Sequence, residues 1–259
     1  MKLSRRDALR AGGGLVGGAV AGCVERRVTK VETNVAASTT WALSPSTAGE
    51  LDAAGFESYV DEMDTEYGDS GVRGEDAVSS DGFVTAYVQR LPVVGESSGQ
   101  PGGAEPTLRP DDVDRNATGF PVVDAAVALY DADGGDRYRL WAAVDVRQET
   151  FAGDAPATDL SAGVSLRNGT VTRTGDVSDD GDTARVTLDG GTVRRFPLEA
   201  STSDVGTDDR IGEAGYYVVD WTGSTDGVQS VKGVVEVDGA GEYDFGWSVG
   251  AAYRRLQRK

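Results

Sequence analysis

Histidine is absent from this sequence of 259 residues, and cysteine occurs once, as Cys23. Without histidine the chain cannot build a Ser-His-Asp or Cys-His catalytic centre, nor a zinc or copper site with histidine ligands. With one cysteine it cannot form an intramolecular disulfide, although exported domains often carry them. We therefore expect packing and backbone hydrogen bonds alone to hold the fold together, and we predict no catalytic residue.

Lysine is scarce as well, with four residues, and the 43 acidic side chains outnumber the 25 of Lys and Arg, for a net charge of −18. So negative a surface repels phosphates, which argues against a nucleic-acid partner. Abundant acids, scarce lysine and many Ala, Gly, Val and Thr residues resemble the composition of proteins from salt-loving archaea, in which concentrated salt shortens the range of charge repulsion. An acidic protein from an ordinary organism is the alternative.

Long apolar runs are also missing, since a membrane-spanning helix needs about 20 mainly apolar residues. The run from Ala11 to Ala21 is interrupted by five glycines and follows four basic residues. A charged start and a short apolar core predict a secretory signal. The pair Arg5 and Arg6 ahead of this weakly hydrophobic core resembles a twin-arginine export signal, which a receptor reads as an address.

The segment Val20-Ala21-Gly22-Cys23 resembles a lipobox. The resemblance implies cleavage before Cys23 and a lipid on its sulfur, because the thiolate is the nucleophile that accepts the lipid. We therefore expect a signal peptide at 1–22 and a single β-rich domain at 23–259, exported and held on the outer face of the cell membrane through Cys23. The alternatives are a buried N-terminal helix in which Cys23 is a core thiol, and an uncleaved signal that acts as the anchor.

The first part of the domain combines strands with one helix. Residues 31–43 alternate between apolar and polar with period two, which predicts a half-buried strand, and residues 83–94 read as another. Residues 47–67 begin with capping-box spacing and continue as an amphipathic helix. The apolar stripe of this helix, which we expect to contact the core, is Phe56, Val60, Met63 and Tyr67. The Gly-, Pro-, Ser- and Asp-rich stretch 95–121 predicts a flexible loop.

The rest of the chain reads as antiparallel strands separated by turn residues. Three hairpins are predicted, across the turns at 131–136, Asn168-Gly169 and Asp189-Gly190-Gly191, followed by a meander of strands near 215–222, 227–237 and 242–254. The cleanest alternation is in the last of these strands. Together these patterns predict a mainly β fold, an antiparallel sandwich or barrel of about 9–11 strands with one N-terminal amphipathic helix.

Two kinds of modification or ligand site are suggested by short motifs. Asp131, Asp133 and Asp136 share a turn and offer the oxygen ligands that calcium prefers, although solvated turns on an acidic protein give the same pattern. No other cofactor is expected. Asn116-Ala-Thr118 and Asn168-Gly-Thr170 are glycosylation sequons, of which Asn116 is the better acceptor because Asn168 has a turn role.

From these observations we expect a non-catalytic binding or structural domain on the cell surface, with an unidentified ligand or protein partner. One alternative is a β-barrel lipoprotein that binds a small solute or lipid in a pocket lined by Trp247 and Tyr243. A second alternative is a carboxylate-dependent hydrolase, which needs only two acids about 5 to 10 Å apart.

Overall fold

The computed structural model describes residues 34–46, 48–74, 81–93, 121–132, 135–147, 156–199, 203–239 and 245–256. All of them belong to one compact unit, Val31–Arg258, and none to the second unit, Met1–Lys30 with Lys259. The expected export signal, the lipobox and Cys23 therefore lie outside the described residues, as do Asn116, Asp133 and the loop 95–121 apart from Pro121.

The described chain is mainly strand, with one α-helix, which confirms the expected fold class. Its elements in order are β1 (Asn34–Leu43), β2 (Gly49–Leu51), α1 (Ala53–Tyr67), the 3-10 helix η1 (Gly68–Ser70), β3 (Phe83–Pro92), β4 (Val122–Ala132), β5 (Gly135–Asp145), β6 (Ala157–Leu166), β7 (Thr170–Thr174), β8 (Asp176–Asp179), β9 (Thr183–Leu188), β10 (Gly191–Pro197), β11 (Asp204–Arg210), β12 (Gly212–Glu213), β13 (Tyr216–Thr225), β14 (Val228–Asp238) and β15 (Phe245–Leu256). The described strands outnumber the 9–11 expected.

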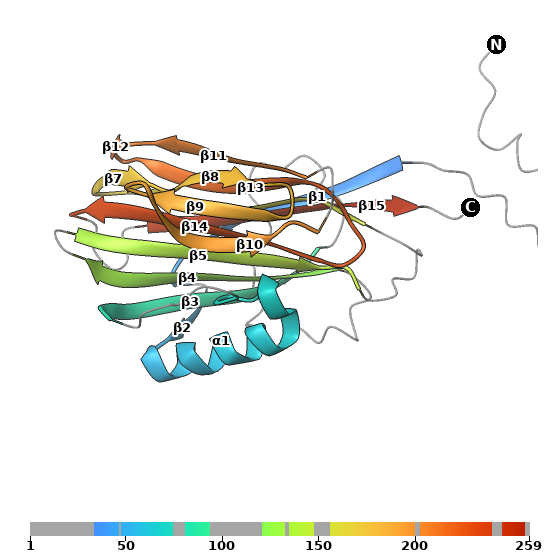
Figure 1. Ribbon diagram of the computed structural model, residues 1–259. Helices are drawn as coiled ribbons and strands as arrows, with labels where there is room; N and C mark the ends of the chain where they lie inside the picture. Colours follow the sequence, from blue (N-terminus) through green and yellow to red (C-terminus); the bar gives the residue numbers. More distant parts are fainter. Residues whose placement is uncertain are drawn as a thin grey trace, which may run out of the picture. The chain divides into compact units, whose positions relative to one another are not determined.

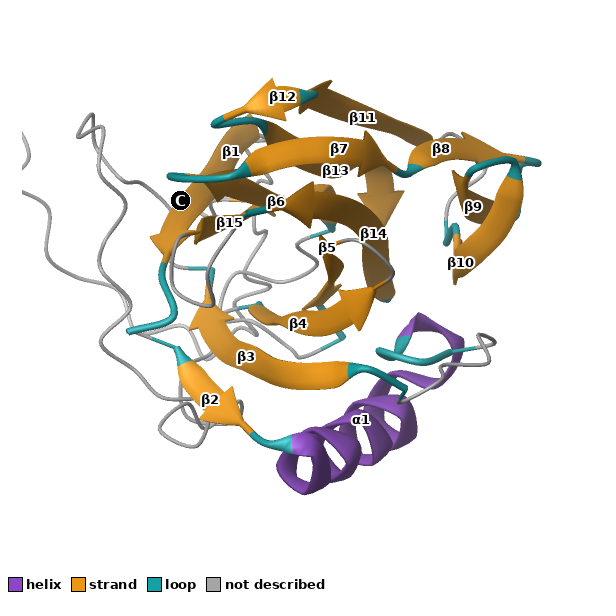
Figure 2. Cartoon of the chain, turned by 90° about the vertical axis from the view of Figure 1, so that its left-hand side faces the viewer, coloured by secondary structure: helices purple, strands orange, loops and turns teal. Residues whose placement is uncertain are grey.

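The strands form three antiparallel sheets (Figures 1 and 2). Sheet A has the order β1-β15-β6-β13-β11, sheet B the order β12-β7-β14-β5-β4-β3-β2, and sheet C the order β10-β9-β8. The inner faces of sheets A and B enclose the main hydrophobic core, as in a sandwich. Sheet C closes one side of this core with Ala184, Val186 and Phe196.

The alternation predicted for the last strand is confirmed. Phe245, Trp247 and Val249 of β15 are buried in the main core. Trp247 is only 3% exposed, so it is part of a packed core. Its predicted neighbour in a pocket, Tyr243, lies outside the described residues.

Three of the predicted strand pairings are wrong, two in the meander and one in a hairpin. β13 and β15 both pair with β6 in sheet A, whereas β14 pairs with β5 and β7 in sheet B, so the last three strands form no meander. The turn at Asn168-Gly169 leads from β6 in sheet A to β7 in sheet B and makes no hairpin. Both edges of β6 are occupied by β13 and β15, so the strand that follows cannot pair with it. The hairpins β4–β5 and β9–β10 are confirmed.

The helix begins later than predicted. Gly49–Leu51 pairs with β3 as the short strand β2, so the chain is extended where the capping box was expected. Asp52 is the N-cap, and its Oδ1 accepts a hydrogen bond from the backbone N of Gly55 at 2.8 Å. Gly68, with a positive φ of 59°, ends the helix.

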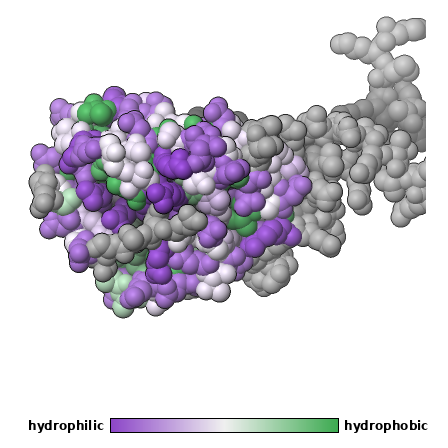
Figure 3. All heavy atoms as spheres, viewed as in Figure 1, coloured by the Kyte–Doolittle hydropathy of each residue, from purple (hydrophilic) through white to green (hydrophobic). Residues whose placement is uncertain are grey.

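Helix α1 lies on the outer face of sheet B, beside β3 and β4 (Figure 2). The predicted core stripe is confirmed, and it packs into a second hydrophobic cluster with Ala86, Ala126, Trp141 and others from the sheet. Among the described residues, no helix is both long enough and apolar enough to cross a membrane. The surface seen in Figure 3 is mostly hydrophilic, with small scattered apolar patches.

Candidate ligand-binding cavity

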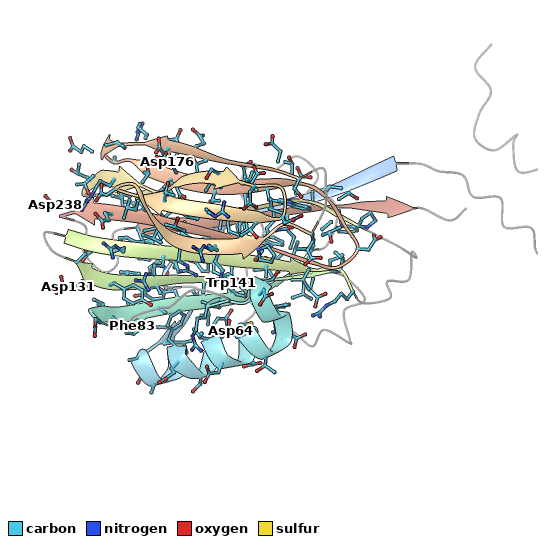
Figure 4. The ribbon with its side chains drawn as sticks, viewed as in Figure 1. Asp64, Phe83, Asp131, Trp141, Asp176 and Asp238 are labelled. Atoms are coloured by element: carbon cyan, nitrogen blue, oxygen red, sulfur yellow. The ribbon has the colours of Figure 1, made fainter. Side chains whose placement is uncertain are left out.

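A cavity of about 610 Å³ lies between α1 and the outer face of sheet B. Its apolar walls come from α1, from the segment after it and from three strands of the sheet. They are formed by Phe56, Val60, Val72, Phe83, Ala126, Ala128, Tyr130 and Trp141. Phe83 and Trp141 both lie between the sheet and the helix (Figure 4). A volume of this size and a largely apolar, aromatic lining are typical of sites for small molecules.

Small side chains on β4 leave the space open. Ala126 and Ala128 face the helix and are 2% and 3% exposed, so they form the floor of the cavity. Larger rings stand around them. Phe56 and Phe83 stack with their centroids 5.5 Å apart, and Phe83 meets Tyr130 edge-on at 5.6 Å. These aromatic contacts fix the walls relative to the floor.

The C-terminal end of α1 is fastened to the sheet by polar contacts. The hydroxyl of Tyr67 donates to Asp124 of β4, a carboxylate that also accepts from Arg90 Nε at 2.6 Å. Arg147 Nη2 lies 2.9 Å from Asp145 Oδ2 and 3.3 Å from Glu66 Oε1, bridging the end of β5 to the helix. The opposite end of the helix lines the cavity with Ala53, Ala54 and Phe56. The helix is therefore held at its C-terminal end by polar contacts, and at its N-terminal end it follows β2, which pairs with β3.

The segment after α1 closes one side of the cavity because three side chains of the sheets hold its carbonyl groups. Trp141 Nε1 donates to the oxygen of Ser70 at 3.0 Å, and Arg194 Nη2 to that of Val72 at 2.6 Å. Lys232 Nζ donates to the carbonyl oxygen of Arg73 at 3.0 Å. Arg194 and Lys232 are 3% and 0% exposed, so two buried cations stand behind this wall.

The polar part of the lining is mostly positive. Arg73, Arg139 and Arg194 line the cavity, and Glu57 is the one acid among the lining residues that the structure describes. Arg73 is bridged to Asp61 of α1, with Nη2 and Oδ1 3.1 Å apart. This balance is the reverse of that in the whole chain, where acids are in excess by 18.

Arg139 of β5 is the lining cation that lies on the ring of an aromatic wall residue. Its guanidinium carbon lies 4.2 Å from the centroid of the Tyr130 ring, within cation–π range. Within the described chain, no carboxylate forms an ion pair with it. Burial lowers the pKa of Arg139, and repulsion from Arg194 and Arg137 lowers it further, although the attraction of Tyr130 opposes the change. An arginine remains charged even so.

A second, more polar cavity of about 440 Å³ adjoins this one, and Tyr130 and Arg139 line both. Its other described charged lining residues are Asp81, Asp131, Arg137, Arg173 and Glu236. Arg137 and Glu236 form an ion pair, with Arg137 Nε 3.0 Å from Glu236 Oε1. The Arg139 guanidinium therefore stands where an apolar space meets a polar one.

This arrangement can bind a ligand. The two-carboxylate hydrolysis considered as an alternative needs a pair of acids in one cleft. Among the described residues, the lining of the larger cavity includes one acid, Glu57, on the exposed surface of α1. The walls can exclude water from an apolar body, and the arginines can hold an anionic group.

Of the residues singled out as possible ligands, Asp131 lines the second cavity. Asp131 and Asp136 are cross-strand partners at the β4–β5 turn, and burial, followed by the charge of Asp131, raises the pKa of Asp136. Asp133, the third residue of the expected calcium site, lies outside the described residues, so this site stays a prediction. Among the described residues no group of three or more potential ligands is close enough to hold a metal ion. Asn168 is exposed in the turn between β6 and β7, and its glycosylation stays a prediction.

The cavity itself was missed because its residues look ordinary in the sequence. Alternating arginines in a strand, such as Arg137 and Arg139, are typical of a solvent-facing side. One signal did point to it. The run Val122–Tyr130 of β4 is apolar on both faces apart from Asp124, and a strand of this kind needs cover on both sides. A cover over β4 also extends over its neighbour β5, and so over Arg139.

No protein-family model, curated protein or solved structure matches this chain.

Proposed function

We propose that this chain is a non-catalytic binding domain of an exported, lipid-anchored protein, and that it holds a small, largely apolar molecule in the cavity beneath α1. The observation that carries the proposal is the cavity of about 610 Å³ with its aromatic walls and alanine floor. A packed helix–sheet interface normally leaves few voids larger than a water molecule. A space of this size, walled by aromatic side chains and floored by alanines, is a site for a ligand.

The location rests on the order of the signals at the start of the chain. Arg5 and Arg6, the short apolar core and the box ending at Cys23 follow one another as in exported lipoproteins. β1 begins at Asn34, eleven positions after Cys23, so the tether is short. The binding cavity therefore works close to the membrane surface.

The cavity is tested with a neutral apolar probe and a variant that fills the space. The probe is 11-bromoundecanol, whose bromine quenches tryptophan fluorescence on contact, and Trp141 in the wall reports its arrival. We expect saturable quenching of the unaltered protein, strongly reduced in Ala128→Leu. Val84→Leu adds bulk on the same sheet at an exposed position, 49% accessible, and should bind as the parent does. The proposal is contradicted if quenching survives in Ala128→Leu. It is also contradicted if neither the parent nor Trp141→Phe shows quenching.

Anchoring is tested separately with Cys23→Ser. We expect the variant to lose its lipid and to leave the membrane fraction, because a serine hydroxyl does not take the place of the thiolate. The altered protein should keep the circular dichroism spectrum of the parent after purification. Unchanged membrane association would overturn the anchoring part of the proposal without touching the cavity.

A further inference from the structure

We infer that the ligand of this cavity is an anionic amphiphile, a molecule with one carboxylate-like head group on an apolar body, and that Arg139 recognises the head group. The inference rests on the proposed function, because it names the class of molecule that the cavity takes. It comes from the charge of the lining, from the surroundings of Arg139 and from the position of that residue between two cavities.

The charge of the lining is the first observation. A protein with 43 acids and 25 basic residues would be expected to line its hollows with carboxylates. Among the described residues, this cavity is lined by three arginines and one glutamate, and the buried cation Lys232 binds the carbonyl oxygen of the lining residue Arg73. An anion that enters therefore leaves a repulsive outer surface for an attractive interior. A cation would find the opposite.

The surroundings of Arg139 are the second observation. The guanidinium is half-buried, rests on the Tyr130 ring and, among the described residues, pairs with no carboxylate. Its charge is repelled by those of Arg194 and Arg137. A bound anion would relieve this repulsion and would replace the hydration that burial removes from the guanidinium. A planar guanidinium matches a carboxylate in two parallel hydrogen bonds.

The position of Arg139 is the third observation, and it points to an amphiphile. The residue lines both the apolar cavity under α1 and the polar cavity beside Glu236. A head group at Arg139 would face the polar side. The apolar body would then extend over Ala128 and Ala126 towards Phe56 at the helix. The molecule would be oriented along the cavity, with its charged end held and its body shielded from water.

A matched pair of probes tests the inference, 11-bromoundecanoate against 11-bromoundecanol, which differ only in the head group. Both are used below the concentration at which they form micelles, with Trp141 quenching as the signal. We expect the parent protein to bind the carboxylate at least about tenfold more tightly, as a charge-assisted hydrogen bond gives. In Arg139→Met this preference should disappear, while the affinity for the alcohol stays within about twofold of the parent value.

Two further variants separate recognition from general effects of charge. Arg195→Met removes a cation from an exposed position of the same strand as Arg194, outside this cavity, and should keep the preference. Arg139→Lys keeps the charge without the planar guanidinium and should keep part of the preference for the carboxylate. Equal binding of both probes by the parent would overturn the inference and leave the proposed function standing. Binding of neither probe would contradict the proposed function itself.

Discussion

The Nε atom of Arg90 lies 2.6 Å from Oδ1 of Asp124, in an ion pair buried between α1 and sheet B. The side chain of Asp124 is 2% exposed, and that of Arg90 17%. Burial alone would lower the pKa of Arg90, but the hydrogen bond and attraction of Asp124 outweigh it and raise this pKa. Tyr67 shares the same carboxylate, so the pair connects β3, β4 and the helix.

We predict that Arg90→Met destabilises the fold by about 3 to 5 kcal/mol, because it leaves the buried carboxylate of Asp124 without its arginine. Adding Asp124→Asn should recover a large part of this loss. The amide carries no charge and still offers an oxygen to the Tyr67 hydroxyl. The free energy of unfolding, from denaturant titration, measures both variants. A double variant less stable than Arg90→Met alone would contradict the prediction.

The β9–β10 turn offers a test of backbone conformation. Asp189 and Gly190 both have positive φ, of 52° and 76°, as a two-residue hairpin turn requires. A Cβ on Gly190 would meet nothing within 4 Å, so Gly190→Ala should cost only the backbone strain, about 1 kcal/mol. Gly191→Ala is the control, since its φ is not in the left-handed region and its nearest neighbour would be 3.7 Å away. Equal losses for the two variants would rule out this explanation.

Asp220 on the outer face of sheet A predicts a dependence on pH. Burial raises the pKa of Asp220, and the charges of Asp204, Asp208 and Asp159 raise it further. A raised pKa of an acid means that the folded state prefers the protonated form. The stability it contributes is therefore complete below the unfolded-state pKa, near 4, and is lost as the pH rises through the folded-state value.

Asp220→Asn should accordingly stabilise the protein at pH 7, by less than about 1 kcal/mol, and have little effect near pH 3. Thermal unfolding of parent and variant at both pH values measures the difference. Asp226→Asn removes the same charge from an exposed turn and controls for net charge. The prediction fails if Asp220→Asn helps more at pH 3 than at pH 7.

The acidic composition predicts a requirement for salt. With a net charge of −18, self-repulsion should weaken the fold in dilute buffer. At about 1 M salt the Debye length falls to about 3 Å, and the repulsion is screened. We expect the circular dichroism spectrum and melting temperature to recover as NaCl is added, and KCl to act alike. A full native spectrum at low ionic strength would argue against adaptation to salt.

Much of the fold was predictable because the alternation of apolar and polar residues along a single strand shows which of its faces is buried. The pattern of Trp247, Val249 and Ala251 gave the buried side of β15 correctly. The sequence of a strand does not show which other strand it pairs with. β14 resembles its neighbours along the chain, yet it joins the other sheet. β11 was missed because five of its seven residues are exposed and its sequence, with Asp204, Asp208 and Asp209, reads as a loop.

The cavity was less predictable than the fold, for a reason that Arg139 illustrates. A cation on a strand is exposed or buried according to what covers that strand, and the cover here is a helix from a distant part of the sequence. The same is true of Ala126 and Ala128. From the sequence they are predicted as core residues, and they form the floor of a cavity only because the helix lies at a distance from them.

The pairing of the first and last strands determines how the domain responds to a pull on its N-terminal side. β1 is bonded to β15 along all 10 of its residues, from Asn34↔Leu256 to Leu43↔Trp247 (Figure 1). Hydrogen bonds between strands run perpendicular to the strand axis. A force along β1 therefore loads them in shear, so that they resist together and do not open one after another. With the proposed anchor at Cys23, β1 would be the strand through which the domain withstands mechanical drag.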